Sequence, residues 1–176
     1  SVDSDPSLVV DSGVIRTKPS PKKMRVLSNS DQSRRTKEIS ERLLHLIDCY
    51  RPSLICAESL SMPRNASVTA KMGRCWGVID ALSVVKSVPV IDITPQQIKK
   101  SLCGKRSASK EEVQGAVAAR VNGAASALSR TEPKSMVEHV ADAIGAVVGC
   151  SSANEMVLLR GQLSDHSRTR VRGDQL

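Results

Sequence analysis

Apolar residues recur at helical spacing between positions 34 and 50, with charged residues between them. Positions 39, 43, 46, 47 and 50 are Ile, Leu, Leu, Ile and Tyr, which predicts an amphipathic helix with one buried face. Arg51-Pro52 ends this helix, because the residue before a proline is driven out of the helical conformation. The apolar run that follows, residues 53–57, is typical of a buried strand, and Glu58 comes directly after it.

Helices and strands continue to alternate in the next part of the chain. The pattern predicts a helix over residues 66–86 and a strand over residues 88–93. Thr94-Pro95 then fits the N-cap and first position of another helix.

Two S-x-x-E sequences head the apolar patterns that come after these elements. Ser109 with Glu112 and Ser135 with Glu138 each fit a capping box, in which side chains satisfy the free N–H groups of a helix start. Residues 122–133, between the two predicted helices, are small and polar and predict a loop.

The first 30 residues predict the edge of a sheet. Residues 1–5 have the pattern of the end of a strand, and apolar patches at 12–16 and 24–28 flank a segment with two prolines, which predicts a β-hairpin. Hairpin, helix, strand, helix, strand and further helices together indicate an α/β domain with a mixed sheet. We assign residues 1–150 to this domain and residues 151–176 to a mobile C-terminal extension.

Composition narrows the class of protein. The 176 residues suffice for one domain, and a chain with one Trp, one Tyr and no Phe must build its core from aliphatic side chains. Five cysteines without a CxxC pair suggest neither a zinc site nor a disulfide framework, and favour a reducing compartment. We find no export signal and no apolar run long enough to span a membrane. We therefore expect no membrane partner and a cytoplasmic or nucleoid-associated protein of a bacterial or phage-infected cell, with an organelle as the alternative.

The charge balance points to a polyanionic partner. Lys and Arg number 26 against 18 Asp and Glu, a net charge of +8, which is typical of nucleic-acid binding but also of proteins that are merely basic. Residues 16–37 hold eight basic side chains against Asp31 alone, and residues 99–110 hold five with no acid before Glu111. Each cluster could contact phosphates or form a solvated surface.

Three acids and a histidine could meet at one end of the predicted sheet. Asp5, with Asp3 as an alternative, ends the first strand, Glu58 ends a later one, and Asp142 lies one helical turn from His139. Oxygen-rich clusters suit Mg²⁺ or Mn²⁺, and a metal pair about 3.5–4 Å apart can activate water at a phosphodiester. Taken singly, such an acid is more often a turn or capping residue, so the prediction rests on the constellation.

A succession of short motifs runs through residues 1–150. These motifs are Asp5-Pro6-Ser7-Leu8, Ser12-Gly13, Ile55-Cys56-Ala57-Glu58, Asn65-Ala66-Ser67, Lys71-Met72-Gly73-Arg74, Gly77-Val78, Pro89-Val90, Thr94-Pro95-Gln96-Gln97-Ile98-Lys99-Lys100, Gly104, Ser107-Ala108-Ser109-Lys110, Val113-Gln114 and His139-Val140-Ala141-Asp142-Ala143. Their succession resembles that of the RuvC family of Holliday-junction resolvases.

This resemblance implies an RNase H-like fold with a five-stranded mixed sheet flanked by helices. It also implies a homodimer that resolves four-way or branched DNA by hydrolysis with two Mg²⁺ ions, for which Mn²⁺ can substitute. By resemblance, the metal-binding and catalytic residues are Asp5 (or Asp3), Glu58, His139 and Asp142, with Lys110 as a further catalytic residue. The candidate DNA-binding residues are Lys99, Lys100, Lys105, Arg106, Lys110, Arg64, Asn65, Lys71 and Arg74.

Two departures from the family pattern leave alternatives open. His139 occupies a position where many members have Asp, so the site carries one negative charge fewer. Ser61 or Met62 replaces an aromatic residue that in some relatives wedges into the junction. A branched-DNA or flap nuclease with a relaxed structure preference is therefore one alternative, and a non-catalytic DNA-binding module is another.

Overall fold

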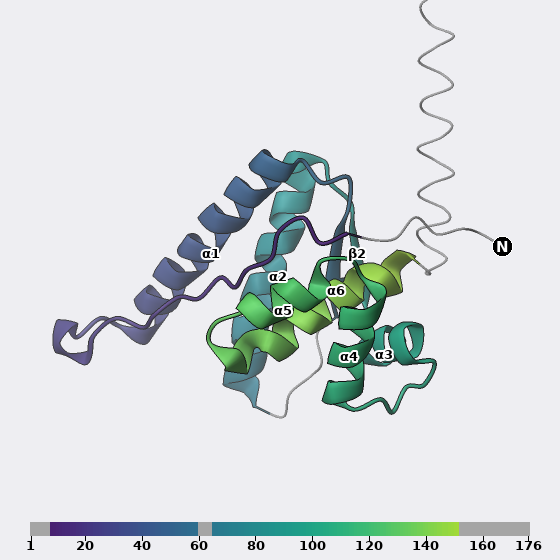
Figure 1. Cartoon of the computed structure of the whole chain (residues 1–176). Coiled ribbons are helices and arrows are strands. Elements are labelled where there is room, and N and C mark those ends of the chain that lie inside the picture. Colours follow the sequence, from purple (N-terminus) through teal and green to yellow (C-terminus); the bar gives the residue numbers. More distant parts are fainter. Residues whose placement is uncertain (1–7, 60–64, 152–176) are drawn as a thin grey trace, which may run out of the picture.

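The computed structural model describes residues 8–59 and 65–151. Its elements, shown in Figure 1, are η1 (Lys22–Met24), α1 (Ser28–Tyr50), β1 (Ile55–Glu58), α2 (Ala66–Lys86), β2 (Val90–Ile93), α3 (Pro95–Cys103), α4 (Lys110–Arg120), α5 (Ala124–Arg130), η2 (Lys134–Met136) and α6 (Val137–Ser151). In these ranges no helix is both long and apolar enough to cross a membrane.

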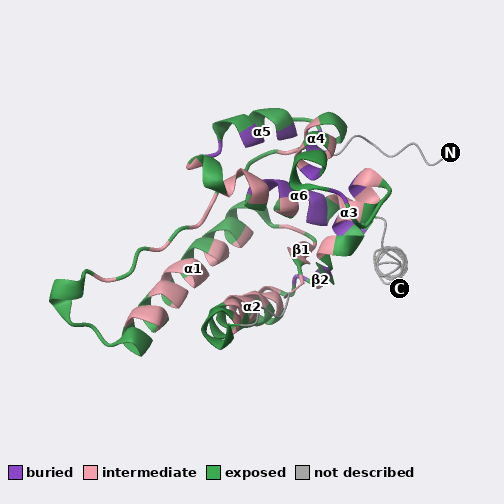
Figure 2. Cartoon of the chain, turned by 90° about the horizontal axis from the view of Figure 1, so that it is seen from below, coloured by how far each residue is buried: buried purple, intermediate pink, exposed green. Residues whose placement is uncertain are grey.

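Two parallel strands form the centre of the described fold. Cys56 of β1 lies opposite Ile91 of β2, and Glu58 lies opposite Ile93. Ile91 and Ile93 are buried whereas Asp92 between them is exposed, which is the two-residue period of a strand. The strands lie between α2 on one side and α6 with α3 on the other (Figure 2), so the domain is an α/β structure with helices on both faces.

Helix α6 is the centre of the hydrophobic core. It packs against α3, α4, α5 and both strands, and its buried face includes Val140, Ala141, Ala146 and Cys150. Small residues let α3 come close, because a methyl group at Gly145 would lie 2.8 Å from Ile98 Cγ2 and 2.9 Å from Leu102 Cδ1. The buried hydrophobic residues of the described ranges are Val, Ile, Leu, Ala and Cys, which confirms the predicted aliphatic core.

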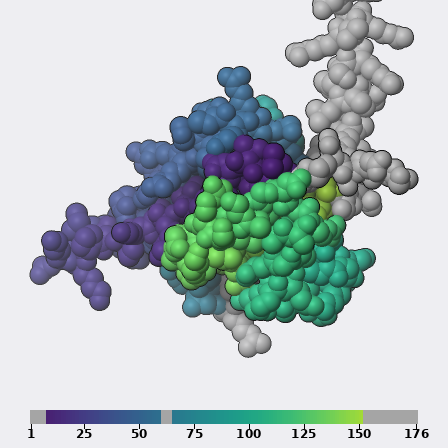
Figure 3. All heavy atoms as spheres, in the orientation of Figure 1, coloured from purple at the N-terminus to yellow at the C-terminus, as the bar shows by residue number. Residues whose placement is uncertain are grey.

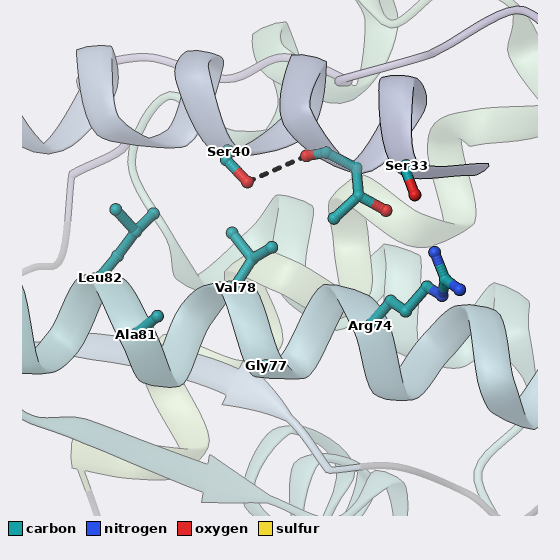
Figure 4. A pocket seen from close by; sticks show the side chains of 8 residues that line it. Ser33, Ser40, Arg74, Gly77, Val78, Ala81 and Leu82 are labelled. Carbon is teal, nitrogen blue, oxygen red and sulfur yellow. Dashed lines mark hydrogen bonds between the residues drawn. The ribbon is translucent and has the colours of Figure 1, made fainter. Parts of the chain in front are cut away.

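Helices α1 and α2 pack against each other beside this core, and neither has a buried residue in the described structure. An open groove of about 440 Å³ runs between them. Figure 4 shows Ser33 and Ser40 of α1 facing Arg74, Val78 and Leu82 of α2 across it.

Several predicted elements are confirmed. The helix over residues 66–86 has the predicted bounds, and the two predicted strands appear as the shorter β1 and β2. Thr94 caps α3 in a capping box with Gln97, and Ser109 caps α4 in a capping box with Glu112. All five cysteines are free thiols in the structure.

The predicted β-hairpin is wrong. Residues 9–27, which we call the N-terminal strap, contain η1 and otherwise irregular backbone, and α1 begins at Ser28, six residues before the predicted start. Pro19 and Pro21 donate no backbone hydrogen bonds and so cannot take full part in a ladder. Instead the strap runs along the molecule, where Val9 N donates to Asn122 O at 2.8 Å and Tyr50 Oη donates to the Asp11 carboxylate at 2.6 Å.

Two further predictions fail in the second half of the chain. The expected loop over residues 122–133 contains helix α5, whose Ala124, Ala127 and Leu128 are buried at i, i+3, i+4 spacing. Ser135 does not open a capping box, because η2 leads directly into α6 at Val137 and the Glu138 carboxylate instead accepts a hydrogen bond from Lys110.

The structure leaves two expectations about the ends of the fold untested. The five-stranded sheet stays a prediction, since residues 8–59 and 65–151 contain the two strands β1 and β2. Of the predicted C-terminal extension, residues 152–176 lie outside the described residues.

Candidate active site

The end of β1 and the first turns of α6 border a hollow of about 190 Å³, which we call the acidic hollow. Glu58 reaches it from β1, since a strand's last residue stands at the sheet edge, and Glu138 and Asp142 reach it from α6, because residues four apart share one helix face. Lys99 of α3 and Lys110 of α4 also line it. Its remaining lining residues are Pro95, Ile98, Val113, Gln114 and Ala141.

The acids of the hollow repel one another. Partial burial raises the pKa of Glu58, and the negative charges of Asp142 and Glu138 raise it further, while His139 acts in the opposite direction. Burial likewise raises the pKa of Asp142, with Glu138 adding to the effect and His139, Lys99 and Lys110 opposing it. Ionised carboxylates at this place are therefore unfavourable unless a cation offsets their charge.

Lys110 is held in place by an acid that the sequence did not single out as a site residue. Its Nζ lies 2.8 Å from the Glu138 carboxylate, and this hydrogen bond raises the pKa of Lys110. The pair joins the start of α4 to the start of α6 across the hollow. Glu138 directly precedes His139 and lies four residues before Asp142, so its position on the same helix face was the one available signal.

The donor set of the hollow fits a divalent cation in part. Glu58 and Asp142 offer the oxygen ligands that such ions prefer, and burial first and neighbouring acids second raise the pKa values of both carboxyl groups. His139 is exposed and lies one turn before Asp142. Among the residues described, no three His, Cys, Asp or Glu side chains are grouped closely enough to hold a metal ion, and the predicted first ligand, Asp5 or Asp3, lies outside them.

The candidate DNA-binding residues fall into separate places. Lys99 and Lys110 line the acidic hollow, and Lys100 and Arg106 are exposed at and after the end of α3. Lys105 Nζ lies 2.5 Å from the Glu112 carboxylate.

The candidates around α2 do not line the acidic hollow. Lys71 is exposed on α2, and Arg74 lines the α1–α2 groove (Figure 4). Asn65 caps α2, where its side-chain oxygen accepts from Ser67 N and Val68 N at 2.9 and 3.3 Å. Arg64 lies outside the described residues.

Known proteins resemble this chain in sequence. The profile of the family described as crossover junction endodeoxyribonuclease RuvC matches residues 4–150. The protein of that name from Chromobacterium violaceum is 30% identical over 167 residues, 95% of this chain and 83% of the relative. That from Hydrogenovibrio crunogenus is 34% identical over 82 residues, 47% of this chain and 48% of the relative. The matched part thus spans about half the length of several of these relatives.

Solved structures resemble the fold. Thermus thermophilus RuvC in complex with Holliday junction substrate superposes with a TM-score of 0.57 and 24% identity over 70% of each chain. A second Thermus thermophilus RuvC structure gives a TM-score of 0.55 and 23% identity, again over 70% of each chain. These likenesses confirm the predicted RNase H-like α/β fold.

Proposed function

Because the chain belongs to the RuvC family of crossover junction endodeoxyribonucleases, we propose that it is a metal-dependent endodeoxyribonuclease that resolves four-way DNA junctions. The observation that carries this proposal is the acidic hollow, where burial and the neighbouring acids raise the pKa values of Glu58 and Asp142 beside two lysines. A hollow in which acids repel one another, in a protein with a net positive charge, is suited to bind divalent cations and the phosphate groups that such cations accompany.

In this proposal Glu58, His139 and Asp142 hold the divalent cations together with Asp5, or with Asp3 as the alternative. Mg²⁺ is the proposed ion, with Mn²⁺ as a substitute. When bound, such ions lower the pKa of water and neutralise charge on the phosphate. His139 would add a nitrogen ligand without a negative charge. It would bind as the neutral imidazole, because a protonated ring nitrogen has no lone pair for the metal.

The lysines of the hollow would act on the substrate rather than on the ions. Lys110 is fixed by Glu138 at 2.8 Å, so its ammonium group is already placed beside the acids before DNA arrives. A cation held there offsets the negative charge that develops on the phosphate during strand cleavage. Lys99 of helix α3 lines the same hollow and would contact the neighbouring phosphate.

The substrate and the assembly follow from the same family membership. Thermus thermophilus RuvC has been solved with a Holliday junction, and a four-way junction presents two equivalent strands. We therefore propose a homodimer, with one acidic hollow for each strand to be cut. Residues 1–150 would form the nuclease domain, whose complete sheet has five strands.

Glu58→Gln tests the proposal. It keeps the size of the side chain and removes the charge, so binding to a four-way junction should persist while Mg²⁺-dependent cleavage is lost. Glu41→Gln is the matched control, because Glu41 is an exposed acid of α1 outside the acidic hollow. Cleavage by Glu58→Gln at the rate of the unaltered protein would overturn the assignment.

The replacement of the wedge aromatic by Ser61 or Met62 favours a second candidate with the same active site, a branched-DNA or flap nuclease. Both residues lie outside the described ranges. Cleavage rates on four-way junctions, Y-forks and flaps distinguish the two, since a junction resolvase should prefer the first by a wide margin. A non-catalytic DNA-binding module would bind all three and cut none with any divalent cation.

A further inference from the structure

The N-terminal strap carries a group of cations that the acidic hollow does not explain. Its tip, around η1, projects from the body of the molecule at the end opposite α3 and α4 in Figures 1 and 2, and Figure 3 shows it as a spur on the surface. The strap has no acid after Asp11. Its five basic residues are Arg16, Lys18, Lys22, Lys23 and Arg25.

Helix α1 holds the backbone of the strap in place. The Asp31 carboxylate accepts from Ser20 N at 2.9 Å and from Ser20 Oγ at 2.6 Å. Arg34 donates to Lys18 O at 2.6 Å, and Arg35 Nε donates to Thr17 Oγ1 at 2.8 Å. The hydrogen bonds from Ser20 and Arg34 lower the pKa of Asp31 to about 2, so this acceptor is ionised at neutral pH.

These hydrogen bonds use the strap's backbone and hydroxyl groups and leave its basic side chains to solvent. None of its five cations forms an ion pair with any residue of the described ranges. Three of the four lysines and arginines of α1 differ, because Arg34, Lys37 and Arg42 each pair with an acid of their own helix. Lysines and arginines without a partner break no ion pair when they bind an external anion. Because the backbone that carries them is already held in one shape, they also lose little conformational entropy.

We propose that the N-terminal strap binds the phosphate backbone of a duplex DNA arm at a distance from the bond that is cut. The strap has cations and no aromatic side chain, so it is suited to phosphate contacts and not to base stacking. The choice of DNA as the polyanion rests on the proposed function. The position of the strap, away from α3 and α4, assigns it to a part of the DNA that the acidic hollow does not reach.

The triple variant Lys22→Gln, Lys23→Gln and Arg25→Gln tests this surface. Binding to a four-way junction and to linear duplex is measured in EDTA between 50 and 200 mM salt. Each phosphate contact contributes roughly 0.9 to the slope of log affinity against log salt. Losing three contacts should make the slope shallower by about 2.7, so the ratio of the two proteins' affinities changes about 40-fold across this range.

A second triple variant, Lys37→Gln, Arg42→Gln and Lys134→Gln, is the matched control. It removes the same charge, but each residue already pairs with an acid in the structure. We expect its slope to change by less than about 1. Equal changes in both variants would show that only net charge matters and would overturn the proposal, as would an unchanged slope in the strap variant.

The readouts separate this proposal from the proposed function. Binding in EDTA does not depend on cleavage, so a protein that uses the strap but cuts no DNA contradicts the nuclease assignment alone. Shortening the arms of the junction should abolish the difference between the strap variant and the unaltered protein. If the variant kept its DNA slope and lost binding to phosphatidylserine vesicles, the strap would be a membrane surface and the proposal would be wrong.

Discussion

The close approach of α6 to α3 gives a quantitative prediction for Gly145→Ala. The new methyl group would lie 2.8 Å from Ile98 Cγ2 and 2.9 Å from Leu102 Cδ1, whose residues are 2% and 4% exposed and have little room to move. Overpacking of this kind costs about 1–3 kcal/mol. Alanine returns roughly 1 kcal/mol through its higher helix propensity. The expected net loss of unfolding free energy is therefore about 0–2 kcal/mol.

Gly115→Ala in α4 is the matched control, because no atom lies within 4 Å of its added methyl group. This variant should gain the helix-propensity term alone, about 1 kcal/mol. The two variants should then differ by the overpacking cost, about 1–3 kcal/mol. With a shift of about 2–4 °C per kcal/mol for chains of this size, their melting temperatures should differ by about 2–12 °C.

Thermal unfolding followed by circular dichroism in EDTA measures this difference without any contribution from bound ions. Urea unfolding gives an independent value, provided that both variants show the same dependence on urea. Equal stability of Gly145→Ala and Gly115→Ala would refute the reasoning. It would mean that Ile98 and Leu102 yield freely and that α3 and α6 are not closely packed.

Three shorter predictions concern the acidic hollow and the thiols. An acid with a raised pKa binds its proton more tightly in the folded state, so the stability of the protein falls as pH rises from the ordinary pKa through the raised one. Asp142→Asn should therefore raise the melting temperature at neutral pH in EDTA. The same substitution should abolish the stabilisation by Mn²⁺, which is about 2.7 kcal/mol when the ion is present at 100 times its Kd. Glu138→Gln should change stability by less than about 1 kcal/mol, because its ion pair with Lys110 is partly exposed. It should nevertheless lower the turnover of junctions, as Lys110→Ala does. If the losses of turnover multiply in the double variant, the two residues act separately, contrary to this prediction. Burial raises the pKa of Cys56 to about 12, so a thiol reagent should label the exposed Cys49 first, and a fast phase that persists in Cys49→Ser would contradict this order.

Local signals in the sequence predicted local structure well. The capping boxes headed by Thr94 and Ser109 need only residues three positions apart, and both form. The hairpin failed because its two prolines indicate a turn but do not indicate what the flanking segments pair with. That choice depends on Asp31, Arg34 and Arg35, which are 11 to 18 residues away from their partners in the strap.

The sequence predicted some residues of the acidic hollow and missed the role of another. Glu58 and Asp142 do line one hollow, as the succession of family motifs implied, although 84 residues separate them and no periodicity joins them. Glu138 was assigned to a helix cap because an S-x-x-E pattern is the commonest reason for a glutamate there. Its actual partner, Lys110, is 28 residues away, so only the tertiary structure could identify it.

Helix α6 serves both the core and the acidic hollow, which limits how this protein can be altered. The same helix presents Val140, Ala141 and Ala146 to the core and Asp142 to the acidic hollow, so a substitution that repacks one side also moves the other. Selection or design for higher stability would be least disruptive at positions of α1 and α2 that neither hold the strap nor carry Lys71 and Arg74, because these helices have no buried residues and lie outside the hollow. Changes of substrate or ion preference are better sought on α3 and α4, where side chains other than Lys99 and Lys110 can vary while the central helix stays in place.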